Sequence, residues 1–185
     1  MLVKVKQSLF GNPKIELQIH RVDARIWHLF KDHHYLTEDL NPSCQCFLFT
    51  WGENPVGFVG ALNSPSQHDT TAMRGSRTVV LPEFQGLGLG AKMSEFVGGI
   101  YKSVDKNFYT KTVHPALGEY REKSDKWEGT TFNLKERKVY DPKAKNRVTR
   151  VSYCHKYVGE SIYGAEDLIK PISEMRLTKY ITKLF

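Results

Sequence analysis

The sequence predicts an α/β (α+β) fold, in which strands and helices follow one another along the chain. Strand-like runs, either apolar or alternating, recur along the chain between turn residues. A glycine-rich turn, Gln85–Ala91, separates one such run from an apolar pattern at helical spacing. With 185 residues, 40% of them hydrophobic, the chain can bury a core of ordinary size. We therefore expect a single domain over residues 1–185, of which residues 160–185 could form a C-terminal appendage.

The first third of the chain is expected to form one strand, one helix and a hairpin. Residues 14–19 alternate strictly and predict a half-buried strand. Asp23 can cap a helix over about 24–34, where apolar residues recur at helical spacing. Strands are expected over 44–51 and 56–62, and the turn residues between them indicate a hairpin.

The rest of the chain begins with a strand over residues 72–81, which enters the glycine-rich turn, and a helix over 90–103. A strand is expected over 107–113, since the following His114-Pro115 cannot continue a ladder. A short helix should follow within 115–127. The later segments are expected to form an antiparallel hairpin of residues 131–140 and 147–158, then a short helix and a tail within 160–185.

The glycine-rich turn is the most informative segment, because its composition suits a phosphate group. The first N–H groups of a helix have no partner within the helix, and the helix dipole places partial positive charge there. Glycines let the backbone approach an anion closely and turn with positive φ. The segment is therefore expected to hold a phosphorylated cofactor.

Two of the three glycine-rich loops that bind such cofactors fit poorly. A P-loop ends in Gly-Lys-Ser/Thr, whereas Gly90 is followed by Ala91 and Lys92. The dinucleotide fingerprint is G-x-G-x-x-G after the first strand of a βαβ unit. Here the spacing is Gly86-x-Gly88-x-Gly90, and it follows several strand-like runs.

The third loop fits best. The run Val-Val-Leu-Pro-Glu-Phe-Gln-Gly-Leu-Gly-Leu-Gly, residues 79–90, resembles the acyl-CoA pyrophosphate loop of the GNAT superfamily of N-acetyltransferases. Its pattern, Gln/Arg-x-x-Gly-x-Gly/Ala, is matched by Gln85, Gly88 and Gly90. The resemblance implies a mixed, mostly antiparallel sheet flanked by helices. In that fold the strands before and after the loop helix splay apart to admit the pantetheine arm.

The resemblance also implies that acetyl-CoA, or another acyl-CoA, is the cofactor. Backbone groups of Val79, Val80 and Leu81 would polarise the thioester carbonyl and hold the pantetheine amides. The loop amides would bind the pyrophosphate. The expected loop residues are Gln85, Gly86, Leu87, Gly88, Leu89, Gly90 and Ala91.

The sequence identifies the catalytic acid and base less clearly, because the segment expected on the acceptor side departs from the family pattern. Many GNAT enzymes that act on small molecules carry Ala-x-x-Phe-Tyr-x-x-x-Gly-Phe, whose tyrosine protonates the thiolate, whereas this chain has His-Pro-Ala-Leu-Gly-Glu-Tyr over 114–120. Histidine is favoured as a base because it titrates near neutrality. The candidates are His34 and Tyr35 at the end of the first helix, His114 near the expected leaving sulfur, and Tyr120. Each of these could instead be a cap, a core residue or a backbone-bonded side chain.

Positive charge is concentrated in one segment. Residues 134–150 carry seven basic and two acidic residues, a net charge of +5 out of +7 for the whole chain. Such a patch attracts polyanions. A solvated hairpin tip, or a field that attracts anionic CoA, would have the same composition. Nucleic acid, bound through residues 135–150, is therefore a hypothesis for a partner.

Several other classes of protein are disfavoured. No run of about 18 apolar residues could span a membrane, and the N-terminus lacks the pattern of a signal peptide. Three cysteines, an odd number, favour a reducing and therefore cytoplasmic location. Cys44 and Cys46 are interpreted as small buried side chains on one face of a strand. The histidines His28, His33 and His34 lack the spacing of a metal site, so no metal is expected.

The leading interpretation is an enzyme, an acyl-CoA-dependent N-acyltransferase that moves an acetyl or similar acyl group to an amine. One alternative is a GNAT-fold protein that modifies nucleic-acid bases, akin to phage Mom-type DNA-modification proteins, with a flipped base in its pocket. The other is a non-catalytic module that binds CoA. DNA retention with its salt dependence tests the first alternative, and a single-turnover thioester assay tests the second. The sequence does not name the acceptor, the acyl group or the oligomeric state.

Overall fold

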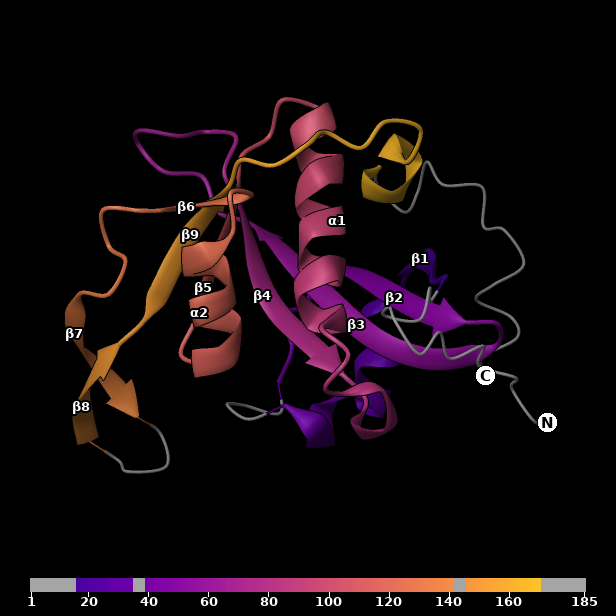
Figure 1. The fold of residues 1–185 in the computed structure, drawn as a ribbon, viewed down its shortest axis with the longest axis horizontal. Coiled ribbons are helices and arrows are strands. Elements are labelled where there is room, and N and C mark those ends of the chain that lie inside the picture. Colours follow the sequence, from indigo (N-terminus) through magenta and orange to yellow (C-terminus); the bar gives the residue numbers. More distant parts are fainter. Residues whose placement is uncertain (1–15, 35–38, 142–145, 171–185) are drawn as a thin grey trace.

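The computed structural model describes residues 16–34, 39–141 and 146–170. The described strands form a large sheet and a separate hairpin (Figure 1). The strands of the large sheet are β1 (Gln18–Val22), β2 (Gln45–Trp51), β3 (Asn54–Asn63), β4 (Met73–Val80), β5 (Phe108–Thr112), β6 (Trp127–Gly129) and β9 (Tyr153–Tyr157). The hairpin consists of β7 (Glu136–Asp141) and β8 (Asn146–Val151).

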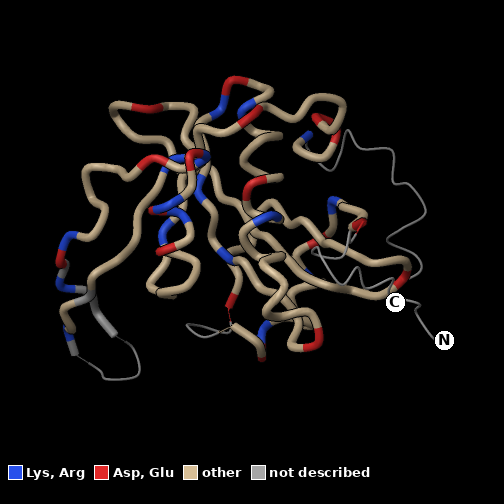
Figure 2. Tube along the Cα trace, viewed as in Figure 1, with Lys and Arg blue, Asp and Glu red and all other residues tan. Residues whose placement is uncertain are grey.

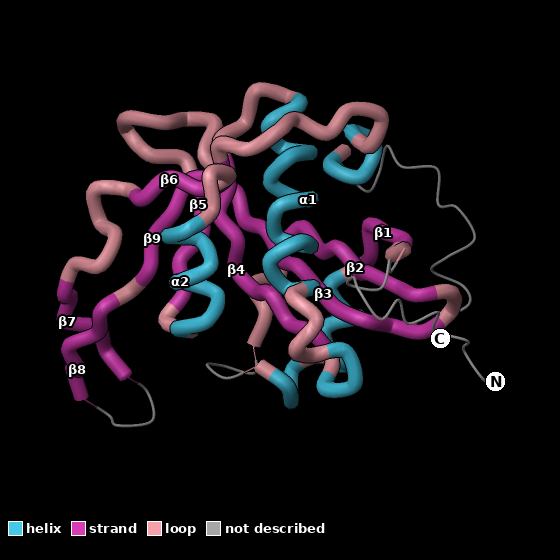
Figure 3. Tube along the Cα trace, in the orientation of Figure 1, coloured by secondary structure: helices cyan, strands magenta, loops and turns pink. Residues whose placement is uncertain are grey.

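The described helical elements are two α-helices and four short 3₁₀ helices (Figure 3). They are η1 (Ala24–Leu29), η2 (Lys31–His33), η3 (Pro82–Phe84), α1 (Leu89–Ser103), α2 (Pro115–Lys123) and η4 (Glu166–Ile169). In Figures 1 and 3, α1 and α2 lie side by side over one face of the large sheet. The glycine-rich turn joins β4 to α1, as predicted.

The large sheet has the order β1-β2-β3-β4-β5-β9-β6. Its neighbouring strands pair in antiparallel fashion except for β4 and β5, which run parallel. This parallel pair is joined through α1, because parallel neighbours need a crossover connection. The mixed, mostly antiparallel sheet flanked by helices is the fold that was predicted.

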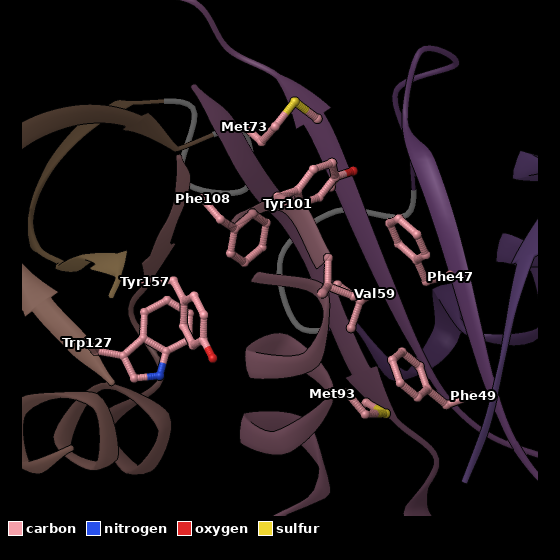
Figure 4. Close-up of a cluster of buried hydrophobic side chains, with 11 residues drawn as sticks. Phe47, Phe49, Val59, Met73, Met93, Tyr101, Phe108, Trp127 and Tyr157 are labelled. Atoms are coloured by element: carbon pink, nitrogen blue, oxygen red, sulfur yellow. The ribbon is translucent and has the colours of Figure 1, made fainter. Parts of the chain in front are cut away.

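Each face of the sheet has its own core. Successive residues of a strand point to opposite faces, so Phe47 and Phe49 of β2 lie on one side and Cys46 and Leu48 on the other. The first pair packs with Met93 and Tyr101 of α1 (Figure 4), and Val97 of α1 belongs to the same core. The second pair packs with η1, and Cys44 is buried with it. The interpretation of Cys44 and Cys46 as small buried side chains is confirmed.

The prediction of one continuous helix over 24–34 is wrong, because this segment forms two short 3₁₀ helices. Asp23 caps this segment as predicted, since its carboxylate accepts a hydrogen bond from the Arg25 N–H at 2.8 Å. The backbone then forms η1 and η2, which meet at the fully buried Phe30. Bulky residues such as Trp27 and Phe30 are weak helix formers, and burying them against the sheet outweighs the regularity of one α-helix.

The strand expected over 147–158 is two strands. Ser152 interrupts it, so that β8 pairs with β7 whereas β9 enters the large sheet between β5 and β6. Trp127, the last residue of the segment expected to hold a short helix, begins β6 instead. Pairing with β5 and β6 buries Cys154, His155 and Tyr157, which a free hairpin would expose. The first strand, expected over 14–19, spans Gln18–Val22, and residues 14 and 15 lie outside the described residues.

Candidate functional site

A gap opens in the large sheet between β4 and β5. The two strands pair only where Met73, Arg74 and Gly75 face Phe108, Tyr109 and Thr110. Beyond Gly75, β4 continues to Val80 with β3 as its strand partner, whereas β5 continues beside β9. The strands therefore separate toward their C-terminal ends, which lie next to the glycine-rich turn. The expected splay of these strands is present.

Backbone groups of β4 face this gap. The Leu81 N–H donates to the Val56 carbonyl at 2.9 Å, toward β3. Backbone groups alternate sides along a strand, so those of Val79 also face β3, and those of Thr78 and Val80 face the gap. The Gln85 side-chain amide donates to the Val80 carbonyl at 2.9 Å. Of the three expected strand residues, Val80 therefore directs its N–H into the gap.

Two glycines of the turn adopt conformations that other residues rarely take. Gly86 has φ 81° and Gly88 has φ 70°, both in the left-handed region. A Cβ at either position would meet no other atom within 4 Å. The backbone conformation, rather than crowding, therefore explains these glycines, and the surface beside them is open.

The turn leaves the start of α1 without capping partners. Gly88 occupies the N-cap position with no side-chain hydrogen bond, and the first turn of α1 carries no acidic residue. Within the described chain, no acceptor contacts the N–H groups of residues 86–91. Gly90 lies against Val80 and Thr78, at 3.5 and 3.8 Å from its virtual Cβ to their methyl groups. An anion bound by these N–H groups would thus lie beside the gap.

His114 lies at the C-terminal end of β5 and caps α2. The side chain is exposed, and its Nδ1 accepts a hydrogen bond from the Leu117 N–H at 3.4 Å. An Nδ1 that accepts a hydrogen bond carries no proton, so in the neutral ring the proton is on Nε2. His114 can therefore present a donor near the splayed end of β5.

Tyr120 of α2 contacts a buried carboxylate on α1. Its hydroxyl donates to Glu95 Oε1 at 2.6 Å, and the Glu95 residue is only 4% exposed. Lys92 and Lys126 approach the other carboxylate oxygen at 3.4 and 3.6 Å. The Glu95 carboxylate raises the pKa of Lys92. The Tyr120 proton is therefore held by Glu95, between the two helices.

Glu95 was missed by sequence reasoning. An acidic residue within the apolar pattern of 90–103 was the available signal, because an ion is buried only where partners compensate it. A second contact between the helices supports the same packing, since the buried Arg121 donates to Ser94 Oγ at 3.0 Å and lies over the Trp127 ring at 4.6 Å.

His34 lies on the opposite face of the sheet from Tyr120. Its ring meets Trp27 edge to face, with centroids 5.7 Å apart, and Trp27 belongs to the core shared with η1. The structure thus separates His34 from Tyr120 by the thickness of the sheet. Tyr35 lies outside the described residues.

Another missed residue is His155, which is 1% exposed on β9. Its Nε2 contacts Glu122 Oε1 at 2.6 Å, whereas its buried Nδ1 has no hydrogen-bond partner among the described residues. Burial lowers the pKa of His155, although Glu122 acts in the opposite direction. Protonation would place a second N–H at Nδ1 without an acceptor, so the neutral ring is favoured.

The described residues form neither a metal site nor a membrane-spanning helix. Among them, no three His, Cys, Asp or Glu side chains are grouped so that they could hold a metal ion. No helix in this part of the chain has both the length and the apolar character needed to cross a membrane.

Comparison with known proteins identifies the family. The model of the acetyltransferase (GNAT) family matches residues 14–114. No curated protein matches the sequence. The relation to Mom-type proteins stays a prediction, since none of these comparisons tests it.

Solved structures of acetyltransferases share the fold. The ribosomal-protein-S18-alanine N-acetyltransferase from Escherichia coli superposes with a TM-score of 0.55 at 13% identity, covering 80% of this chain and 99% of its own. YncA of Salmonella typhimurium, solved with its cofactor acetyl-CoA, superposes with a TM-score of 0.55 at 12% identity. The match covers 76% of this chain and 92% of YncA. A protein from Bacillus anthracis that is described as a streptothricin acetyltransferase was solved in complex with acetyl coenzyme A. It superposes with a TM-score of 0.54 at 13% identity, and the match covers 78% of this chain and 99% of that protein.

Proposed function

Because the chain belongs to the acetyltransferase (GNAT) family, we propose that it transfers an acetyl or similar acyl group from acyl-CoA to an amine. The observation that carries this proposal is the gap between β4 and β5 beside the uncapped start of α1. A cofactor with a diphosphate at one end and a thioester at the other needs both features. Two structures of similar fold hold acetyl-CoA, which supports this choice of cofactor.

The diphosphate would be bound by backbone N–H groups of the turn. The N–H groups of residues 86–91 have no acceptor in the described chain, and the dipole of α1 favours negative charge at this end. Gln85 would support the site indirectly, because its side chain holds the Val80 carbonyl. The site needs no basic side chain, since helix N-termini bind phosphate through the backbone alone.

The pantetheine arm would then enter the gap. Thr78 and Val80 present backbone groups there, which can pair with the amides of the arm as a neighbouring strand would. The Val80 N–H is suited to polarise the thioester carbonyl. A fixed donor of this kind contributes about 10²- to 10³-fold to the rate in acyl transfer.

The gap would connect two sets of acid and base candidates. The amine attacks the acyl carbon, and its nitrogen loses a proton while the C–S bond breaks and the CoA thiolate gains one. His34, on the face of η1 and η2, would accept a proton from an amine that arrives on that face. His114, which presents an Nε2–H in the neutral ring, would stabilise the departing sulfur by a hydrogen bond near the end of β5. Tyr120 would serve as the donor only after its contact with Glu95 changes.

Release of CoA thiol from acetyl-CoA tests this proposal. The purified chain is incubated with acetyl-CoA and a panel of small amines, peptides with free N-termini, and lysine side chains. We expect thiol release that depends on one class of amine, with the acetylated amine found by mass spectrometry. Thiol release without an amine would indicate hydrolysis. Binding of acetyl-CoA without any turnover would replace this proposal with the non-catalytic CoA-binding module.

A further inference from the structure

We propose that the β7–β8 hairpin and its base form a docking surface for nucleic acid. The base consists of Phe132, Leu134 and Val151, where the hairpin joins the rest of the chain. The hairpin projects from the end of the large sheet that carries β6 and β9, away from α1 (Figure 1). This inference goes beyond the proposed acyl transfer and does not depend on it.

Charge is the first observation. Residues 134–150 carry a net charge of +5, which leaves +2 of the chain's +7 to all other residues. Figure 2 shows basic residues in blue along the hairpin. The side chains of Lys135, Lys138 and Arg147 are exposed there. Charge concentrated on one projecting element attracts a polyanion more strongly than the same charge spread over the surface.

Exposed apolar side chains at the base are the second observation. Phe132, Leu134 and Val151 are 57%, 48% and 46% exposed. In the described chain only Leu87 and Tyr163 are other large hydrophobic residues exposed to such an extent. Three of these five residues therefore belong to the base of the hairpin, next in sequence to its basic residues. Base stacking on an aromatic ring next to basic side chains is how proteins hold single strands.

The backbone at the base is both strained and anchored. Leu134 has φ 55°, in the left-handed region, which costs a residue with a Cβ about 1–2 kcal/mol. Its N–H donates to the Ser152 carbonyl at 3.0 Å. Asn133 ties the base to the large sheet, because its side chain accepts from the Cys154 N–H at 2.7 Å and donates to Glu122 at 2.6 Å. Such strain persists where the surroundings hold it, often at functional sites.

The shape of the hairpin favours nucleic acid over other anions. A two-stranded β-ribbon fits the major groove of DNA, which is about 12 Å wide. The β7–β8 hairpin is such a ribbon. An acidic protein is a poorer candidate, because it offers no nucleobases to stack on Phe132. An anionic bilayer is also a poorer candidate, because it would need a broader apolar face.

Binding of a short fluorescent DNA duplex, and of a single strand of the same sequence, tests the proposal by anisotropy over a range of salt concentrations. We expect binding whose logarithmic salt slope reflects phosphate contacts. The variant Lys135→Ser/Lys138→Ser should reduce the slope for duplex by about 1.8, because each phosphate that a lysine neutralises contributes about 0.9. The control Lys31→Ser/Lys106→Ser removes the same charge from exposed residues outside the hairpin and should leave the slope unchanged.

The apolar base is tested separately with Phe132→Ser. This change should weaken single-strand binding by about 5- to 150-fold while the salt slope stays the same, because stacking releases no counterions. Acetyl-CoA binding should be unaffected in all these variants, so failure here is distinguishable from failure of the proposed acyl transfer. Equal effects of the hairpin and control variants, or no binding at about 50 mM salt, would overturn the proposal. Anionic vesicles or polyglutamate binding as tightly as DNA would overturn the choice of nucleic acid.

Discussion

Replacing Gly88 by Asp tests the phosphate site with a single added carboxylate. Gly88 caps α1 with φ 70°, and an added Cβ would enter open space. The left-handed conformation costs most residues about 1–2 kcal/mol, and Asp and Asn adopt it more readily than others. Gly88→Asn is therefore a matched control, since it has the same size and backbone preference as Asp without the charge.

The expected fall in affinity follows from Coulomb repulsion. A carboxylate about 4 Å from a bound phosphate opposes it by about 1 kcal/mol at the dielectric of water and about 4 kcal/mol at the effective value near a protein surface. The dissociation constant of acetyl-CoA should therefore rise about 5- to 1,000-fold in Gly88→Asp. The Asn variant should bind within a few-fold of the parent.

Thermal unfolding with acetyl-CoA measures this difference. A ligand at about 100 times its dissociation constant stabilises the folded parent by about 2.7 kcal/mol, which corresponds to about 5–11 °C for a chain of this length. At the same acetyl-CoA concentration, Gly88→Asp should keep about 1.8 kcal/mol of this stabilisation if its dissociation constant rises about 5-fold. It should keep almost none if the dissociation constant rises about 1,000-fold. If the Asp and Asn variants respond equally, the turn does not bind the diphosphate.

Three further changes test the rest of the site. Changing His34 or His114 to Ala should lower turnover by about 10²- to 10⁴-fold for the residue that moves a proton, with little change in acetyl-CoA affinity by calorimetry. Equal losses of turnover and stability would assign that histidine a structural role. Tyr120→Phe should lower the free energy of unfolding in urea by about 1–3 kcal/mol, because the buried Glu95 loses a donor. An unchanged value would contradict this pairing. Because burial lowers the pKa of His155, the folded chain binds fewer protons than the unfolded chain near pH 6.5, so stability should fall as the pH drops through and below about 6.5. Urea titrations at several pH values should show a smaller loss of unfolding free energy at low pH in His155→Gln than in the parent. Equal losses in the two proteins would show that another group is responsible.

Local patterns in the sequence predicted the part of the fold that carries the cofactor. The strand into the turn, the turn and its helix are consecutive, and each has a strong local signal. Gly86 and Gly88 do adopt positive φ, and α1 begins directly after the turn, at Leu89. The hairpin of β2 and β3 was predicted for the same reason, since alternation and a turn lie next to each other in the sequence.

Features that depend on distant parts of the chain were not predicted. The entry of β9 between β5 and β6 depends on three segments separated by many residues, and alternation alone does not choose a partner for a strand. The contact between Tyr120 and Glu95 likewise depends on how α2 packs on α1. The replacement of one α-helix by η1 and η2 depends on the burial of Phe30 against the sheet, which overrides the helical spacing of the segment.

A crystal structure with bound acetyl-CoA tests the central claim most directly, namely that the turn and the gap between β4 and β5 hold an acyl-CoA. We expect diphosphate oxygens within hydrogen-bond distance of the N–H groups of residues 86–91. The pantetheine arm should lie between β4 and β5, with the thioester oxygen near the Val80 N–H. Acetyl-CoA bound elsewhere, with the turn and the gap empty, would show that neither of them holds the cofactor.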